Sequence, residues 1–289
     1  MKLPHILLVL LLSIAAAAGT VQFMGGAQNG GAVTASAKET AFDRVMRTNT
    51  LRCGYVLYEP FVRKDPNTGA FSGVVVDMMD EMGKSLNLKI DWAEEVGWAT
   101  TVEGLKTGRY DVMCVGFWRQ SLEAKHVFYT LPFAYSKLGV IVRTDDHRFD
   151  NDLNLINQPE IRIASRDGDL SAAVAHRDYP NAKLQQAPNM TTDAQILEDV
   201  ALKKGDVFFL EDINFNTYAK NNPGKLRRLD IPPVRVFQNT LAFLQDEKLK
   251  SLLDTVMIEL VENGAMDKIL DKYDPEKKML LRIKRPGQP

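Results

Sequence analysis

The chain has 289 residues, of which 45% are hydrophobic and 25% are charged, and its formal net charge is -1. This length allows one large domain or two of medium size. Lys and Arg are spread along the chain rather than clustered, and it has no RNP, zinc-finger or helix-turn-helix signature. These features exclude a nucleic-acid-binding surface of the usual basic kind.

The N-terminal segment has the pattern of a secretory signal. Lys2 precedes an apolar run that ends at Ala18, and small residues follow it. Cleavage after Ala18 and cleavage after Ala37 both fit, so we interpret 1–37 as a signal peptide with a flexible spacer and the mature protein as periplasmic. An uncleaved membrane anchor remains an alternative, because no charged side chain occurs between Lys2 and Lys38.

Cys53 and Cys114 are the only cysteines. An even number in an exported protein permits a disulfide, but each lies in an apolar, strand-like stretch where a buried free thiol is common. We therefore expect two buried thiols and keep a disulfide as the alternative. The four histidines lack the spacing of metal ligands, so we expect no metal site and no cofactor.

From Thr50 onward, short apolar runs alternate with amphipathic stretches. The first set has strands at 51–57, 88–96 and 111–115, a helix within 71–88, and a short helix that ends at Gly108. The second set has strands at 161–165 and 206–212 and helices at 171–179 and 190–205. Further strands at 234–244 and two helices separated at Asn263-Gly264 follow.

Strands that alternate with helices imply parallel pairing through right-handed crossovers, which makes an α/β sheet. Ligands of such sheets bind at the carboxyl ends of the strands. The chain passes between the two sets near Val140 to Thr144 and again near Ile231 to Phe237. Two lobes with a cleft between them are therefore predicted, and the double crossover makes a hinge.

Five stretches, taken in order, carry a family resemblance: LRCGYVLYEPFVRKDPNTGAFSGVVVDMMDEM, VEGLKTGRYDVMCVGF, FYTLPF, GDVFFLED and NGAMDKILDKYDP. Over roughly 48–275 the chain resembles the extracytoplasmic solute-binding proteins of family 3, the polar amino-acid receptors of ABC importers. The resemblance implies a two-lobe type II periplasmic binding protein, with lobe 1 from 48–142 and 233–289 and lobe 2 from 143–232. It also implies a monomer that closes on a small-molecule ligand and is then presented to a membrane partner.

The ligand residues implied by the resemblance match this chain only in part. The aromatic residue that stacks on the ligand corresponds to Tyr58, which stands before a Pro-Phe pair. The aspartate that takes the ligand's α-amino group corresponds to Glu211, a chemical match. The hydroxyl residue and the arginine that hold the α-carboxylate correspond to Trp118 and Glu123, and the threonine of the second lobe corresponds to Asp169.

Carboxylates in those places would repel another carboxylate by several kcal/mol in a partly closed cleft. Aromatic faces and carboxylates together suit an amine or a quaternary ammonium ion instead. The predicted ligand-binding residues are Tyr58, Trp98, Trp118, Arg119, Glu123, Asp169 and Glu211.

Most of these residues have a structural alternative. Glu123 suits the first turn of a helix that begins near Ser121, and Asp169 suits a helix N-cap. The two tryptophans suit lobe packing, and Asp212 competes with Glu211 for one role.

The arginine missing from the site has two substitutes in the sequence. Arg119 or Arg166 could take over its work and restore an acidic ligand.

Three functions fit the sequence. The first, which we favour, is a periplasmic receptor, not an enzyme, that serves the membrane permease of an ABC importer or a membrane sensor. The second is a dehydratase-like enzyme on the same fold, in which Glu123 or Glu211 acts as a general acid. The third is a scaffold that has lost its ligand site.

Overall fold

The computed structural model describes residues 39–121 and 123–284. The predicted signal peptide and spacer, residues 1–37, lie outside the described residues. No helix within the described part is long and apolar enough to cross a membrane.

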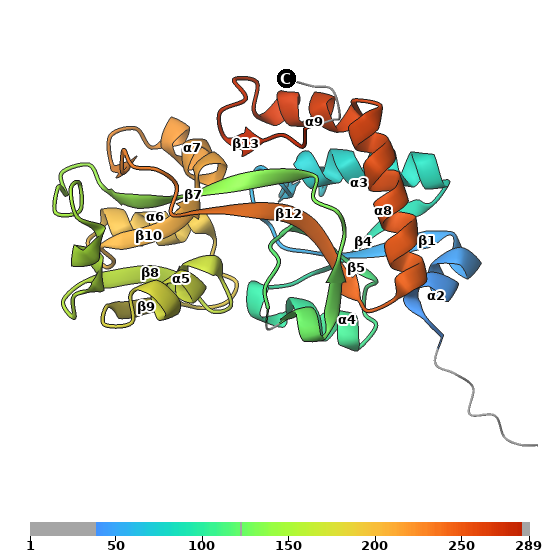
Figure 1. Ribbon diagram of the computed structural model, residues 1–289, viewed down its shortest axis with the longest axis horizontal. Helices are drawn as coiled ribbons and strands as arrows, with labels where there is room; N and C mark the ends of the chain where they lie inside the picture. The colour runs from blue at the N-terminus through green and yellow to red at the C-terminus, as the bar shows by residue number, and fades with distance from the viewer. Residues whose placement is uncertain (1–38, 122, 285–289) are drawn as a thin grey trace, which may run out of the picture. The chain divides into compact units, whose positions relative to one another are not determined.

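The first lobe is built on parallel strands (Figure 1). Strand β1 pairs in parallel with β4 on one side and with β5 on the other. Every residue of β5 is buried, as expected for a strand that is covered on both faces. The elements of this lobe are α2 (Ala41–Thr48), β1 (Thr50–Tyr55), β2 (Arg63–Lys64), β3 (Phe71–Ser72), α3 (Val74–Leu86), β4 (Lys89–Glu95), η1 (Trp98–Thr100), α4 (Thr101–Lys106), β5 (Val112–Phe117), η2 (Glu123–Lys125), β6 (Val127–Tyr129), α8 (Glu247–Glu262) and α9 (Ala265–Tyr273).

The second lobe repeats this plan on a smaller scale. Strand β8 pairs in parallel with β9 and with β10, and helices connect the strands. Helix α6 starts in a capping box made by Thr192 and Gln195, which satisfies its first backbone N–H groups. The elements of this lobe are η3 (Leu153–Asn157), β8 (Arg162–Arg166), α5 (Leu170–Asp178), β9 (Lys183–Ala187), α6 (Asp193–Ala201), β10 (Val207–Glu211), α7 (Asp212–Asn221) and β11 (Leu226–Arg228).

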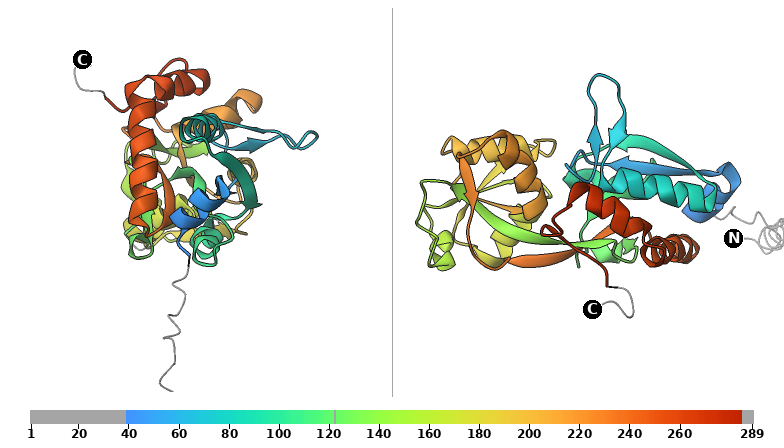
Figure 2. Two further views of the ribbon diagram at one scale, coloured as in Figure 1. Left: turned by 90° about the vertical axis from the view of Figure 1, so that its right-hand side faces the viewer. Right: turned by 90° about the horizontal axis from the view of Figure 1, so that it is seen from above.

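Two long antiparallel strands connect the lobes. Strand β7 (Ala134–Arg143) pairs with β12 over its first half and with β10 over its second half. Strand β12 (Arg235–Leu244) continues into the first lobe, where it pairs with β5 and β6. The strand order β4-β1-β5-β12-β7-β10-β8-β9 therefore runs through both lobes. A short strand, β13 (Leu280–Leu281), also pairs with β7, and the hairpin of β2 and β3 projects from the first lobe in Figure 2.

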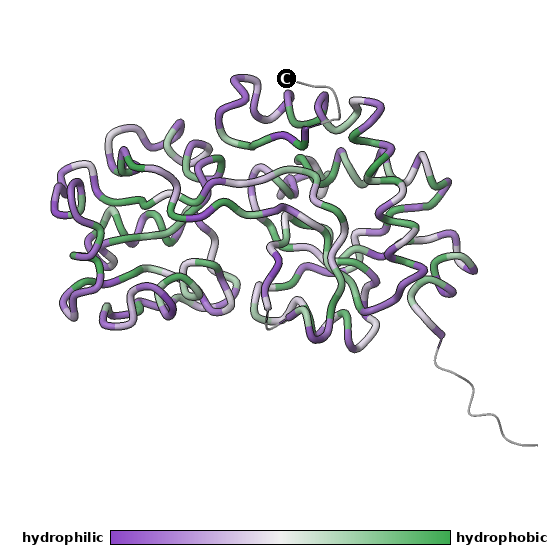
Figure 3. Tube along the Cα trace, viewed as in Figure 1, coloured by the Kyte–Doolittle hydropathy of each residue, from purple (hydrophilic) through white to green (hydrophobic). Residues whose placement is uncertain are grey.

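Apolar side chains follow these strands closely. In Figure 3 the central strands are drawn mostly in green, whereas the outer turns are mostly purple. The buried methionines of α3 belong to this core, as their helical spacing predicts. The core therefore holds the strands in place. The candidate site lies at the ends of these strands.

The free-thiol prediction is wrong. Cys53 and Cys114 form a disulfide, with their Cα atoms 5.4 Å apart. The register of β1 and β5 pairs Cys53 with Val112. Cys114 follows Val112 by two residues, so its side chain lies on the same face of the sheet as that of Val112. The sequence could not decide between thiols and a disulfide, because the choice depends on which two strands are neighbours.

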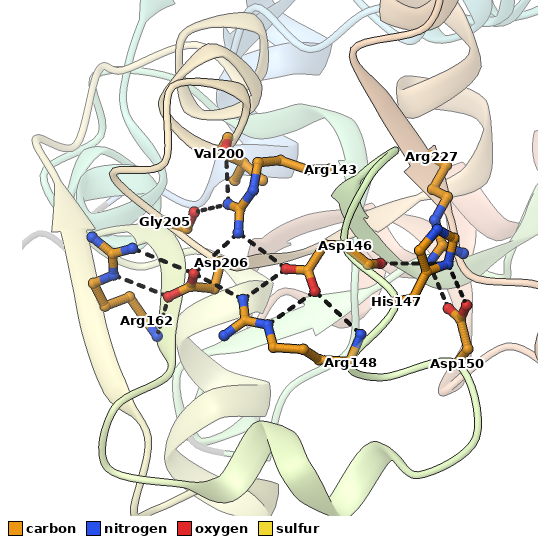
Figure 4. Close-up of polar contacts among 10 residues, drawn as sticks. All are labelled: Arg143, Asp146, His147, Arg148, Asp150, Arg162, Val200, Gly205, Asp206 and Arg227. Carbon is orange, nitrogen blue, oxygen red and sulfur yellow. Dashed lines mark hydrogen bonds and ion pairs between the residues drawn. The ribbon is translucent and has the colours of Figure 1, made fainter.

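A network of arginines and aspartates ties the second lobe together (Figure 4). Buried Arg143 donates to Asp146 at 3.0 Å and to Asp206 at 3.3 Å. Arg148 and Arg162 each donate to Asp206 at 3.0 Å. Burial alone would raise the pKa of Asp206, but the hydrogen bonds from Arg162 and Arg148 lower it to about 2.

Candidate functional site

Six side chains from the two lobes form one group, which we call the interlobe cluster, and all of them except the half-buried Asp193 are buried. Three come from segments that follow strands of the first lobe, and three come from strand ends and a helix start of the second lobe. They are Tyr58, Trp98, Trp118, Arg166, Asp193 and Glu211.

One hydrogen bond in this cluster joins the lobes directly. Tyr58 lies in a tight turn, where its N–H donates to the carbonyl of Val62 at 2.9 Å and its ring stacks on Phe61 at 5.8 Å. Its hydroxyl donates to Oε2 of Glu211, at the carboxyl end of β10. Tyr58 is 2% exposed and Glu211 is 1% exposed, so water is excluded from this contact.

Aromatic rings enclose the Tyr58 side of the cluster. The edge of Trp98 meets Tyr58 with 5.2 Å between ring centroids, and Trp118 stacks on Trp98 at 5.7 Å. Phe237 of β12 continues the row beyond Trp118. The indole nitrogens of both tryptophans are buried, and neither has a hydrogen-bond partner among the described residues.

The described side chains leave little free space next to these rings. The hollow beside Trp98 and Trp118, which Glu123 and Gly168 also line, has no room for a water molecule. A larger groove of about 330 Å³ lies between the lobes on the other side of Tyr58, lined by residues that include Glu59, Asp193 and Asn214. The rings of Trp98 and Trp118 therefore leave no free volume on the side that Glu123 and Gly168 line.

Burial dominates the charge state of Glu211. It raises the pKa of this carboxyl to about 7, although the hydrogen bond from Tyr58 acts in the opposite direction. The nearby Asp193 carboxylate raises the pKa further, and the Trp118 indole lowers it slightly. Burial and Glu211 also raise the pKa of Tyr58 well above its ordinary value, so the phenol keeps its proton.

Arg166 is the only cation of the interlobe cluster, and acids of its own lobe hold it. It forms an ion pair with Asp193, donates to the carbonyl of Thr191 at 2.6 Å, and lies 3.6 Å from Asp169. Burial would lower the pKa of Arg166, but Asp193 and Asp169 raise it above its usual value. The guanidinium is therefore charged and already shared between two carboxylates.

Asp169 also has a structural task in the second lobe. Its carboxylate accepts from the backbone N–H of Ala172 at 2.9 Å and thereby caps α5. Burial raises its pKa to about 6, against the opposing effect of Arg166.

Glu123 and Arg119 have their hydrogen-bond partners outside the interlobe cluster, although Glu123 lines the hollow beside Trp98 and Trp118. Glu123 starts the single 3-10 turn η2 rather than a longer helix, and burial raises its pKa while the Tyr129 hydroxyl, 3.5 Å away, lowers it. Arg119 is exposed, donates to the carbonyl of Thr130 at 2.8 Å and covers the ring of Tyr129.

The pleat separates the two acids at the end of β10. Glu211 faces Tyr58, whereas Asp212 accepts from Arg228 at 2.5 Å and lies 3.8 Å from Lys137. Among the two competing acids, Glu211 is thus the one in the interlobe cluster.

Three interlobe residues were missed in the sequence. Asp193 was hidden in the capping sequence that starts α6. Asn189 accepts from the N–H of Ala99 at 3.0 Å, and Asn214 donates to the carbonyl of Glu59 at 2.5 Å. Neither asparagine has a sequence signal, because each contact depends on the opposite lobe.

The fold and this interlobe site define a two-lobe binding protein. A sequence model of the bacterial extracellular solute-binding proteins, family 3, matches residues 51–276. The chain therefore belongs to this family, as its resemblance predicted.

Individual relatives agree with this assignment. The chain is 22% identical over 217 residues to the L-cystine-binding protein TcyA of Bacillus subtilis (strain 168), covering 75% of this chain and 77% of that protein. The solved structure of the ancestral amino acid-binding protein AncCDT-1, a precursor of cyclohexadienyl dehydratase, is similar with a TM-score of 0.71 and 22% identity, over 81% of this chain and 99% of that one. AbpA of Streptococcus pneumoniae, bound to L-arginine, is similar with a TM-score of 0.70 and 16% identity, over 80% of this chain and 97% of that one.

These comparisons confirm the predicted family and the two-lobe α/β fold. The family is extracytoplasmic. Its curated relatives are named as binding proteins, and one of them, from Haemophilus influenzae, is named as a probable amino-acid ABC transporter-binding protein. The lobe boundaries, the ligand-binding roles of individual residues and the export signal remain predictions.

Proposed function

We propose that the protein is a periplasmic receptor whose lobes close on a small organic cation, such as an amine or a quaternary ammonium ion. The protein acts as a monomer, and its closed form binds the permease of an ABC importer or a membrane sensor. The observation that carries this proposal is the buried Glu211 carboxyl, which has no cationic partner among the described residues.

The balance of charge in the site supports a cationic ligand. Glu211, Asp193 and Asp169 contribute three carboxyls, whereas Arg166 contributes one guanidinium that is already paired with two of them. A ligand cation would take the remaining carboxyl and form charge-assisted hydrogen bonds with it. An anionic ligand would meet uncompensated acids in a site of low dielectric.

The aromatic rings support the same ligand class. Tyr58 and Trp118 lie next to Glu211, and Trp98 packs against both of these rings. A desolvated cation over an indole face gains about 2 kcal/mol, and several such contacts bring a small ligand to micromolar affinity. The AbpA structure bound to L-arginine is an example of this fold holding a ligand that carries a cationic group.

Thermal-shift screening tests the proposal. The protein is screened against amines, betaines, polyamines, neutral and cationic amino acids, and dicarboxylates. At 100 times its Kd a true ligand stabilises the native state by about 2.7 kcal/mol, which raises Tm by roughly 5–10 °C. We expect the shift with the amines, betaines or polyamines and none with dicarboxylates.

A matched pair of variants identifies the residue responsible. Glu211→Gln removes the charge and should weaken cation binding by about 10- to 100-fold. Glu198→Gln is the control, because Glu198 also accepts a tyrosine hydroxyl, from Tyr218 at 2.6 Å, but within one lobe. A shift given only by acidic ligands, or one that Glu211→Gln leaves intact, contradicts the cation proposal.

One observation favours a second candidate, a scaffold without a ligand. The hollow beside Trp98 and Trp118 is too small for water. A flat screen across all ligand classes supports the scaffold. Conversion of a bound compound, followed by mass spectrometry, would instead reveal the dehydratase-like enzyme, in which Glu211 serves as general acid.

A further inference from the structure

We propose that Tyr58 and Glu211 form a proton-dependent latch that closes the two lobes on each other without a ligand, so that a ligand must displace the Tyr58 hydroxyl to reach the carboxyl. The proposed function enters this inference at one point: it supplies the class of ligand that displaces Tyr58. The latch itself is a property of the unliganded protein.

The geometry of the contact is that of an internal competitor. The Tyr58 hydroxyl occupies Oε2 of Glu211, and Oε1 is buried with no hydrogen-bond partner among the described residues. A ligand N–H group would therefore find one acceptor oxygen already bonded to the opposite lobe. Trp98 packs against Tyr58, and Trp118 stacks on Trp98. The hollow that these two indoles line with Glu123 and Gly168 has no room for water.

Other contacts between the lobes close around the latch. Asn189 and Asn214 bond to backbone atoms of the first lobe at Ala99 and Glu59. These bonds involve neutral groups, so their contribution to closure does not change with pH between 5 and 8. Glu211 is the group among these interlobe contacts whose charge can change in that range.

The groups that face Glu211 come from each element packed against it. Tyr58 lies opposite it from the first lobe, Trp118 lies at the end of β5, and Asp193 lies at the start of α6. Arg166 of β8 acts on the Tyr58 side of the pair, and its charge is shared with Asp193 and Asp169. The negative charge of Asp193 disfavours ionisation of Glu211 in the closed form.

The direction of the pH effect follows from these surroundings. In the closed form the pKa of Glu211 is about 7, whereas a solvated glutamate has 4.5. The closed form therefore retains a proton that the open form releases between these values. Raising the pH from 5 to 8 should favour opening by roughly 70-fold, since each pH unit between the two pKa values contributes up to about tenfold.

Small-angle X-ray scattering tests the latch in the absence of any ligand. The protein is unfolded, dialysed and refolded to remove bound molecules, and its radius of gyration is measured at pH 5 and pH 8. We expect a compact form at pH 5 and an expanded form at pH 8. A radius that is the same at both values contradicts the latch.

Three variants separate the latch from other titrations. Glu211→Gln keeps an acceptor for Tyr58 but cannot ionise, so its radius should stay compact at both pH values. Tyr58→Phe keeps the ring but loses the bond, so it should expand already at pH 5. Tyr218→Phe removes the Tyr218–Glu198 bond within one lobe and should behave like the unmodified protein.

The outcomes of the two proposals are independent. If Glu211→Gln still expands at pH 8, another acid such as Asp169 controls opening and the latch is wrong. If the radius responds as expected while no cation stabilises the protein, the latch holds and the proposed ligand class fails. If a cation binds but the radius of gyration does not change with pH, the proposed ligand class holds and the latch is wrong.

Discussion

Two neighbouring acids, Glu211 and Asp212, illustrate how much a single position decides in this protein. Side chains alternate along a strand, so the two residues leave the end of β10 in different directions. Asp212 is neutralised by Arg228 and Lys137, whereas Glu211 meets a phenol and indole rings. The same carboxyl chemistry thus gives an ordinary ion pair in one case and a buried acid with a pKa of about 7 in the other.

Asp206 is a residue at which a single change should cost considerable stability. Asp206→Asn leaves Arg143, Arg148 and Arg162 facing one another without their shared carboxylate. Breaking a buried ion network from one side costs about 3 kcal/mol, which chemical denaturation would measure as a lower midpoint.

The exposed pair of Lys225 and Glu198 provides the comparison for Asp206. Lys225→Gln should cost less than about 1 kcal/mol, because a solvated ion pair contributes little. Equal losses in the two variants would show that the network around Asp206 is no stronger than a surface pair.

At the scale of elements, the disulfide between β1 and β5 has a measurable role. Cys53 and Cys114 are separated by 61 residues, so the bond removes much of the freedom of the unfolded chain. The double variant Cys53→Ala/Cys114→Ala should lose about 2–4 kcal/mol of unfolding free energy. Reduction of the unmodified protein with dithiothreitol should lower the denaturation midpoint to the same value, and no loss in either case would contradict a stabilising bond.

The regular elements could be predicted because their signals are local. The apolar runs of β1, β4, β8 and β10 and the helical spacing of α3 and α8 are visible in short stretches of sequence. Helix α7 was missed, because it begins at Asp212 directly after β10 with no glycine or proline between them. The predicted helix near Ser121 is a single 3-10 turn at 123–125.

The candidate site could be predicted only one lobe at a time. Tyr58, Trp118 and Glu211 occupy the positions of ligand residues in the family that the chain resembles, and the structure brings them together. Their mutual contact, and the part played by Asp193, depend on how the opposite lobe lies, which no local pattern encodes. Arg119 is a candidate substitute for the missing arginine in the sequence, but it packs on Tyr129 instead.

At the scale of the whole described molecule, closure depends on how tightly the lobes approach beside the hinge strands β7 and β12. Gly168 of the second lobe sits against the backbone of the first lobe, where an added Cβ would lie 2.6 Å from the nitrogen of Ala99 and 2.7 Å from its Cα. Because these are backbone atoms, no side-chain rotation can relieve the clash. Gly168→Ala should therefore hold the lobes apart.

A second glycine separates this effect from backbone strain. Gly168 has φ +76° and Gly224 has φ +79°, but no atom lies near the Cβ position of Gly224. Both alanine variants should lose about 1 kcal/mol of stability from the left-handed backbone. Only Gly168→Ala should also show a larger radius of gyration at pH 5, because only there does the new methyl group meet the opposite lobe. Equal radii in the two variants would mean that the lobes close without the contact at Gly168.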